Sequence, residues 1–157
     1  MDKIYSTSRL SIINTAVILT QTDTTVGFLS QNESKLQEIK KRPINKPFIK
    51  VYTDFKTLTS SGMRLPNRQK KHCRRAKKTT FIVKNIAFRV VAYTKSSSVL
   101  NNRTWNYSTS ANESGKNFLR EFCEDKSDII IENSDSLHEG VSSTLYKINN
   151  KKKMRLR

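Results

Sequence analysis

Apolar and polar positions alternate along the chain in two periods, one typical of strands and one of helices. Residues 16–20 form a short apolar run rich in β-branched residues, which is typical of a buried strand, and residues 21–27 follow as a threonine-rich loop. Asn32 is a suitable N-cap for a short helix with one apolar face. This helix should end near Lys41, because the residue before Pro43 is disfavoured in the α region.

The remaining pattern is richer in strands. Residues 79–83 and 86–93 are both β-rich and are joined by Lys84-Asn85, which predicts a hairpin. Residues 64–78 show no strong period, so we expect an exposed loop or a frayed helix there. The order of elements predicts a single domain of residues 1–157 with an α/β or α+β fold, in which helices flank a mixed β-sheet. Further strands are expected at 48–52, 105–108, 129–131, 145–148 and 154–157, and further helices after Asp54 and over 114–123.

Composition excludes several classes of protein. The chain of 157 residues fits one domain, and apolar clusters recur along its whole length, so a disordered protein is not expected. The first ten residues do not resemble a targeting signal, and the longest apolar run, 16–19, is far shorter than the roughly 20 residues of a membrane span. Cys73 and Cys123 have no further ligands at a metal-binding spacing. We therefore expect a reduced, cytoplasmic protein with no membrane contact and no metal held by the protein alone.

The charge of the chain is strongly positive and unevenly distributed. Thirty basic and 13 acidic residues give a net charge of +17, but residues 113–139 carry −5 and the rest of the chain +22. Such a field attracts polyanions. A general preference for lysine is a simpler explanation, but it does not account for the cluster at 64–78, which contains no acidic residue. These candidate RNA-binding residues are Arg64, Arg68, Lys70, Lys71, Arg74, Arg75, Lys77 and Lys78.

Two groups of polar residues in the first third of the chain could bind a ligand. Thr22 and Thr24 follow a buried strand, at the edge where open α/β sheets usually bind ligands, although they could equally cap a turn. Lys40, Arg42 and Lys46 are suited to phosphate oxygens, but cations near a helix C-terminus also have a purely structural explanation.

Two more groups lie in the last third. Ser110 and Asn112 precede Ser114-Gly115 at the predicted start of the 114–123 helix, where free backbone N–H groups and the helix dipole favour anions. A serine-rich helix cap is the alternative. The last group flanks the strand at 145–148 and consists of Ser143, Thr144 and Arg155.

In this order, the four groups resemble the motifs of the YrdC-like family of threonylcarbamoyl-AMP synthases over about residues 9–157. The sequence has Thr-Asp-Thr-x-x-Gly from Thr22, Lys-x-Arg-Pro from Lys40 and Ser-x-Asn-x-Ser-Gly from Ser110. The pairing of Lys-x-Arg with Ser-x-Asn is the specific part of the resemblance. Residues 62–80 depart from the Pro-Gly-Pro-Leu-Thr type of segment that the family has there, with Thr79 or Thr80 as the corresponding threonine.

The resemblance implies a twisted mixed sheet with a concave basic surface. It also implies that L-threonine, bicarbonate and ATP, which would arrive with Mg²⁺, are combined into threonylcarbamoyl-adenylate with release of pyrophosphate. Separate transfer proteins would then pass the threonylcarbamoyl group to an adenosine of tRNA, forming the t6A modification. The implied catalytic residues are Lys40, Arg42 and Lys46; Arg42, Ser110, Asn112 and Arg155 would bind the nucleotide, and Thr22, Thr24, Ser143 and Thr144 would bind threonine.

The alternative is a non-catalytic relative that keeps the fold and binds double-stranded RNA or tRNA through residues 64–78. Binding to phosphates weakens steeply as the salt concentration rises. The salt dependence of tRNA binding and the threonine dependence of pyrophosphate release therefore separate the two hypotheses, although one protein could do both. An unrelated nucleotide-binding protein is a third hypothesis.

Overall fold

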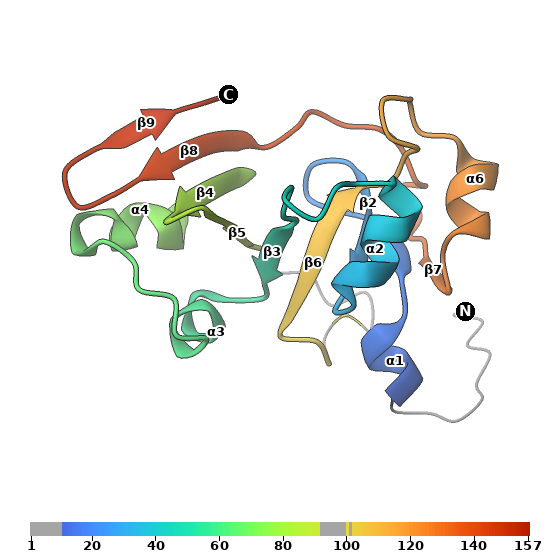
Figure 1. Cartoon of the computed structure of the whole chain (residues 1–157), viewed down its shortest axis with the longest axis horizontal. Coiled ribbons are helices and arrows are strands. Elements are labelled where there is room, and N and C mark those ends of the chain that lie inside the picture. Colours follow the sequence, from blue (N-terminus) through green and yellow to red (C-terminus); the bar gives the residue numbers. More distant parts are fainter. Residues whose placement is uncertain (1–10, 92–99, 101) are drawn as a thin grey trace. The chain divides into compact units, whose positions relative to one another are not determined.

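The computed structural model describes residues 11–91, 100 and 102–157, and the chain divides into two units. Unit 1 comprises Met1–Lys46 and Tyr107–Gly140, and unit 2 comprises Pro47–Asn106 and Val141–Arg157. Each unit contains both parallel and antiparallel strand pairs with helices beside them (Figure 1). The predicted α/β fold with mixed strand pairing is therefore confirmed, while the single domain stays a prediction.

In unit 1 the strands are ordered β7, β1, β2, β6. β1 (Ile18–Gln21) pairs antiparallel with β2 (Val26–Ser30) and parallel with β7 (Ile129–Ile131). β2 also pairs antiparallel with β6 (Trp105–Ser110), which brings Gly27 opposite Ser110. The side chains that this unit buries include Ala16, Val17, Ile18, Leu19, Val26, Phe28, Leu29, Leu36, Ala111 and Cys123.

The prediction of a loop over residues 21–27 is wrong at both ends, because β1 includes Gln21 and β2 already begins at Val26. Gly27 obscured the strand, since glycine is depleted in strands. The structure shows why glycine is needed there. A Cβ atom at this position would lie 3.0 Å from the Cγ2 atom of Thr22 and 3.1 Å from the carbonyl oxygen of Thr109. A side chain at residue 27 would therefore crowd the turn between β1 and β2 and the neighbouring strand β6.

The helix α2 (Glu33–Lys40) begins and ends where the sequence predicts. The Oδ1 atom of Asn32 accepts a hydrogen bond from the backbone N–H of Lys35 at 3.2 Å, so Asn32 is the N-cap. At the other end Lys41 adopts a left-handed conformation, with φ of 46°, and its backbone N–H bonds back into the last turn. The helix buries Leu36 and packs against β2. The other helices of unit 1 are α1 (Ser11–Thr15) and α6 (Arg120–Asp125).

The prediction of a helix over 114–123 is wrong in its first half, because α6 begins only at Arg120. Gly115 has φ of +79°, which ends any helical run at this point. Leu119 was expected on the buried face but is 62% exposed, whereas Cys123 is fully buried. Residues 111–119 instead form irregular turns, which makes them available to shape a site.

In unit 2 the predicted hairpin is confirmed. β4 (Thr79–Val83) pairs antiparallel with β5 (Ile86–Val90). Between them Lys84 and Asn85 have φ of 47° and 66°, the pair of left-handed residues that a type I′ turn requires. Residues 92–93 of the predicted second strand lie outside the described residues.

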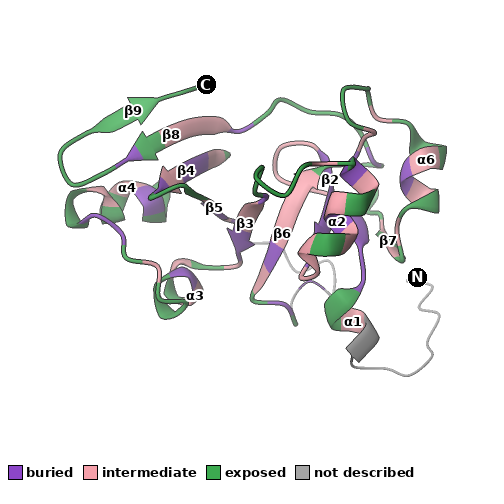
Figure 2. Cartoon of the chain, in the orientation of Figure 1, coloured by how far each residue is buried: buried purple, intermediate pink, exposed green. Residues whose placement is uncertain are grey.

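The other strands of unit 2 extend this hairpin on both sides, in the order β3, β5, β4, β8, β9. β3 (Ile49–Tyr52) is parallel to β5, and β8 (Thr144–Ile148) is parallel to β4. β9 (Lys153–Arg155) pairs antiparallel with β8 and is exposed along its whole length (Figure 2). The strands expected at 145–148 and 154–157 are thus present, each shifted by one or two residues.

The helices of unit 2 begin with α3 (Phe55–Ser60), which Asp54 caps as predicted by accepting a hydrogen bond from Thr57 N at 2.7 Å. The basic segment is more regular than expected. It contains the 3₁₀ turn η1 (Asn67–Gln69) and the helix α4 (Lys70–Arg75), which is anchored by the buried Cys73. The core that α4 joins consists of Tyr52, Leu58, Leu65, Cys73, Phe81, Val83, Phe88 and Ile148.

Both cysteines are free and buried, one in each unit. Within the described ranges, no helix has the length and apolar character needed to cross a membrane.

Candidate functional site

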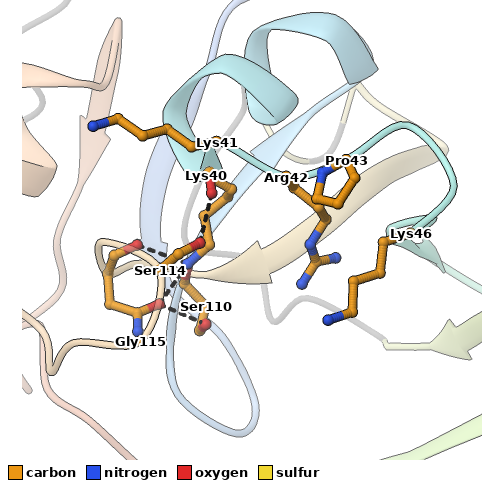
Figure 3. A pocket seen from close by; sticks show the side chains of 9 residues that line it. Lys40, Lys41, Arg42, Pro43, Lys46, Ser110, Ser114 and Gly115 are labelled. Carbon is orange, nitrogen blue, oxygen red and sulfur yellow. Dashed lines mark hydrogen bonds between the residues drawn. The ribbon is translucent and has the colours of Figure 1, made fainter.

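A positively charged pocket of about 440 Å³ lies in unit 1 at the C-terminal end of α2 (Figure 3). None of the residues that line it is acidic, and four are cations. The pocket thus provides a concentration of positive charge that suits a ligand with several negative charges. Its lining residues are Lys40, Lys41, Arg42, Pro43, Lys46, Ser110, Asn112, Ser114 and Gly115.

Lys40 is the last residue of α2 and is only 4% exposed, which is unusual for a lysine. Its Nζ atom donates hydrogen bonds to the carbonyl oxygen of Ser110 at 3.1 Å, to the carbonyl oxygen of Asn112 at 2.7 Å and to Asn112 Oδ1 at 2.6 Å. An ammonium group has three N–H donors. Lys40 therefore uses all of them to hold the turn that follows β6 against the end of α2.

The turn after β6 is held by further bonds that converge on Asn112. The Oδ1 atom of Asn112 also accepts a hydrogen bond from Ser110 Oγ at 2.8 Å, and its Nδ2 donates to the carbonyl oxygen of Lys116. Ser114 Oγ donates to the carbonyl oxygen of Lys40, a group that the end of the helix would otherwise leave without a partner. The Ser-x-Asn-x-Ser-Gly motif is therefore a closed turn fixed to the end of α2, and not the helix N-terminus that the sequence predicted.

Burial lowers the pKa values of two cations at the pocket, Lys40 and Arg42. Burial, and after it the nearby charge of Arg42, lowers the pKa of Lys40 to about 8. Burial also lowers the pKa of Arg42. A bound anion would offset both effects, because an opposite charge favours the charged form of each group.

Arg42 and Lys46 point toward the same space, and Lys41 points away from them (Figure 3). Arg42 is half-buried, whereas Lys46 is exposed. The backbone N–H of Lys46 bonds to the carbonyl oxygen of Pro43 at 3.0 Å, so a tight turn presents Lys46 beside Arg42. Lys41 also lines the pocket, and nothing in the sequence distinguishes it from any other lysine at the end of a helix.

The predicted threonine-binding residues of unit 1 form the turn between β1 and β2. Thr22 Oγ1 donates to the carbonyl oxygen of Thr25 at 2.6 Å and accepts from the backbone N–H groups of Thr24 and Thr25. The hydroxyl of Thr22 thus fixes the turn. Gly140 packs against the same turn so closely that a Cβ atom there would lie 1.9 Å from the carbonyl oxygen of Thr24.

The remaining predicted residues belong to unit 2. Ser143 is buried, and its hydroxyl is 2.8 Å from the hydroxyl of the buried Thr80. Thr144 begins β8 and pairs with Thr79. Arg155 lies on the exposed strand β9, where its Nε atom donates to the carbonyl oxygen of Arg157 at 3.1 Å. Whether these residues bind the same ligand as the pocket of unit 1 stays a prediction.

No family model matches the sequence, and no curated protein matches it. Solved structures do match the fold. A double variant of Sua5 from P. abyssi has a TM-score of 0.75 and is 20% identical, and its match covers 93% of this chain and 53% of that one. The same protein complexed with L-threonine gives a TM-score of 0.74 at 19% identity. E. coli YciO matches 94% of this chain and 85% of its own, with a TM-score of 0.65 and 17% identity.

The chain has the Sua5/YrdC-like fold.

This fold also occurs within a larger protein. Full-length HypF, in a phosphate- and nucleotide-bound form, matches the whole chain with a TM-score of 0.72, although only 25% of HypF is covered and the identity is 10%. The chain spans about half the length of the Sua5 structures that it matches. At these identities the likeness establishes the Sua5/YrdC-like fold and leaves the activity to be argued from the residues.

The predicted RNA-binding residues at 64–78 are exposed cations in the structure. α4 turns Cys73 inward and leaves its four cations in solvent. The part of the chain that the structure describes contains no cluster of three or more histidine, cysteine or acidic side chains placed to hold a metal ion. The exposed basic residues of the segment are Arg64, Arg68, Lys70, Lys71, Arg74, Arg75, Lys77 and Lys78.

Proposed function

We propose that this chain makes threonylcarbamoyl-adenylate from L-threonine, bicarbonate and ATP, for the threonylcarbamoyladenosine modification of tRNA. The observation that carries the proposal is the pocket of unit 1. It combines the Lys-x-Arg and Ser-x-Asn motifs, 70 residues apart in sequence, through hydrogen bonds of Lys40 to Ser110 and Asn112. The Sua5/YrdC-like fold supports it, and one of its relatives is a Sua5 complexed with L-threonine.

In the proposed reaction the amine of L-threonine takes up bicarbonate as a carbamate, with loss of water. A carbamate oxygen then forms a bond to the α-phosphorus of ATP, the bond from this phosphorus to the β-phosphate oxygen breaks, and pyrophosphate leaves. This displacement needs alignment and stabilisation of negative charge more than it needs a strong base. The absence of an acid or histidine from the residues that line the pocket is consistent with that requirement.

Arg42 and Lys46 would bind the phosphate oxygens, because both point into the open space of the pocket (Figure 3). An arginine binds two phosphate oxygens at once, whereas a lysine acts as a point charge. Lys40 would act differently. Its three donors already bond to protein oxygens. Its proposed role is therefore to hold the Ser110–Asn112 turn in place and to add a positive charge to the lining of the pocket.

Mg²⁺ would be bound by the phosphate groups of ATP and not by the protein, because the lining of the pocket contains no carboxylate. Thr22 and Thr24 are proposed to bind L-threonine, and Ser110 is proposed to contact the nucleotide. The product would pass to separate proteins that transfer the threonylcarbamoyl group to tRNA.

The test is pyrophosphate release by the purified chain with ATP and Mg²⁺. Release that requires L-threonine and bicarbonate together supports the proposal, and release that ignores threonine contradicts it. Arg42→Gln should lower the rate at least 100-fold, because a charge-assisted bond to phosphate is worth roughly 1.5–3 kcal/mol and alignment is lost as well. Lys126→Gln, an exposed substitution at the C-cap of α6 that does not line the pocket, is the matched control and should keep the wild-type rate.

A second candidate function is binding of tRNA or double-stranded RNA through the basic segment 64–78. The observation that favours it is α4, which presents Lys70, Lys71, Arg74 and Arg75 to solvent. Affinity for tRNA should fall steeply between low and high salt, because each phosphate contact releases a counterion. An affinity that does not change with salt would contradict this function and leave the first proposal untouched.

A further inference from the structure

The last three residues of unit 1, 138–140, lie along the turn between β1 and β2. The backbone N–H of His138 donates to Oε1 of Gln21 at 3.0 Å, and Gln21 is the last residue of β1. The carbonyl oxygen of His138 accepts from the backbone N–H of Val26 at 3.0 Å, and Val26 is the first residue of β2. This segment, which we call the clamp, is therefore bonded to both ends of the turn.

The clamp also contacts the middle of the turn. The backbone N–H of Gly140 donates to Thr25 Oγ1 at 3.1 Å, and the close approach of Gly140 to Thr24 leaves no room for a Cβ atom. Just before the clamp, Leu137 is buried, and its backbone N–H donates to Glu132 Oε1 at 3.3 Å. The clamp is thus anchored at its start and packed on the turn that carries the proposed threonine-binding residues.

A second set of bonds links the clamp to the pocket of unit 1. The backbone N–H of Phe118 donates to Oε1 of Glu139. The carbonyl oxygen of Val26, whose N–H is bonded to the clamp, accepts from the backbone N–H of Ala111 at 2.9 Å. Both donors belong to the irregular segment 111–119, which supplies lining residues of the pocket. The clamp therefore joins the β1–β2 turn to the segment that shapes the phosphate pocket.

The proposed reaction depends on the distance between these two places. A carbamate oxygen of a threonine held at the β1–β2 turn must lie in line with the α-phosphorus of an ATP held in the pocket. A misplacement of about 1 Å between reacting groups can lower a rate on the order of 100-fold. The turn and the pocket segment are far apart in the sequence, so the contacts that join them set this alignment.

Two of the joining bonds depend on a side chain that lies outside the lining of the pocket. Gln21 is half-buried and attaches the clamp to β1, whereas Glu139 is exposed and attaches it to the pocket segment. Each side chain offers one oxygen to one backbone N–H. Replacing either side chain therefore loosens one attachment of the clamp and leaves the ligand-facing residues in place.

We propose that Gln21 and Glu139 are positioning residues, which act through the clamp to hold the threonine-binding turn and the phosphate pocket at a fixed distance. This inference rests on the proposed synthesis of threonylcarbamoyl-adenylate and extends it to two residues that touch neither ligand. Their effect falls on the alignment of the bound substrates and not on the binding of ATP.

The experiment compares Gln21→Met and Glu139→Met with the wild-type chain. Methionine keeps the length of each side chain and removes its acceptor oxygen. In each variant kcat for threonine-dependent pyrophosphate release should fall on the order of 10- to 100-fold, while the affinity for ATP measured by calorimetry stays at its wild-type value. Because both residues act through one clamp, the double variant should lose no more than the worse single variant.

Conservative variants separate positioning from a general effect on the fold. Gln21→Glu and Glu139→Gln keep an acceptor oxygen at the same place and should recover most of the lost rate. Glu121→Met removes an exposed glutamate from α6, outside the clamp and the pocket lining, and should keep the wild-type kcat. Gln21→Asn, which withdraws the acceptor by one carbon, makes the same test if Gln21→Met does not fold.

Wild-type kcat in both methionine variants overturns the inference. So does a loss of stability in urea with unchanged kcat, which would leave the clamp a purely structural role, and so does a loss of ATP affinity that matches the loss of kcat. Losses that multiply in the double variant would mean that the two residues act separately, which also contradicts a shared clamp. All of these outcomes require release by the wild type, so they leave the proposed function standing, whereas a wild-type chain without threonine-dependent release contradicts that function itself.

Discussion

Replacing Lys40 by methionine removes the ammonium group beneath the pocket and keeps a side chain of similar length. The loss can be followed bond by bond. Of the three oxygens that Lys40 binds, the carbonyl of Ser110 also accepts from Asn112 N at 3.1 Å, and Asn112 Oδ1 also accepts from Ser110 Oγ at 2.8 Å. The loss therefore falls mainly on the carbonyl oxygen of Asn112, which Lys40 binds at 2.7 Å.

Leaving a buried acceptor without its donor lowers the free energy of unfolding by about 1–3 kcal/mol. The exchange of the lysine for methionine, a side chain of similar volume, adds little to this loss. Removing a buried ammonium recovers part of this cost, since burial already lowers the pKa of Lys40 to about 8. We expect Lys40→Met to lower the free energy of unfolding by about 1–2 kcal/mol. Three independent bonds to a charged group would instead cost roughly 4.5–9 kcal/mol.

Urea unfolding of wild type and Lys40→Met over a range of pH measures this directly. The pKa of Lys40 is about 8 in the folded chain against an ordinary value of 10.5. Between these values the unfolded chain binds more protons, so the wild type should gain stability relative to Lys40→Met as the pH rises from 8 to 10.5. Other lysines contribute equally to both proteins and cancel.

The same two proteins and Arg42→Gln are then compared for ATP binding by calorimetry. Arg42→Gln should bind ATP weakly at nearly wild-type stability, whereas Lys40→Met should lose stability and only part of its ATP affinity. The reasoning is refuted if Lys40→Met keeps wild-type stability and loses ATP binding as fully as Arg42→Gln. In that case the lysine would contact the ligand and would not hold the turn.

Three further predictions concern the stability of the two units, each taken by itself. Gly140→Ala should lower the free energy of unfolding in urea by more than about 2 kcal/mol, because its Cβ would overlap a carbonyl of the β1–β2 turn. Gly62→Ala, whose Cβ would meet no atom within 4 Å, should lower it by only about 1–2 kcal/mol, because residue 62 has a positive φ. Equal losses for the two variants would contradict this prediction. In a double-mutant cycle of unfolding free energies, Thr80→Val and Ser143→Ala should show a coupling energy of at least about 0.5 kcal/mol, because their hydroxyl groups lie 2.8 Å apart. Losses of stability that simply add would mean that this contact contributes nothing. Asp54→Ala should lower the free energy of unfolding by about 1 kcal/mol at neutral pH. Because the pKa of Asp54 is depressed in the folded chain, this difference in stability from the wild type should vanish as the pH falls through that pKa. A difference in stability that persists in acid would contradict a charged cap.

Local signals in the sequence predicted most of the elements. Short runs rich in β-branched residues predicted the strands β1, β4 and β7, and the caps at Asn32 and Asp54 placed the starts of α2 and α3. The Lys84-Asn85 turn correctly predicted the hairpin. Each of these depends on a few neighbouring residues, which is why a single sequence sufficed.

The errors arose where distant contacts override local preference. Gly27 interrupts the pattern of β2 because Thr22 and Thr109 need the space, and these contacts cannot be seen in the sequence. The turn at 112–116 replaces the start of the predicted helix because Asn112 bonds to Lys116 and to Lys40. The sequence suggested that Lys40 belongs to the site, but only the structure shows that its three bonds are to the protein itself.

The most direct test of the proposed function follows radiolabelled bicarbonate through the reaction of the purified chain. With ATP and Mg²⁺ present, label should enter a nucleotide-containing product only when L-threonine is added, and Arg42→Gln should abolish this incorporation while remaining folded. Protein that is folded, binds ATP and incorporates no label with all three substrates present would contradict the proposal.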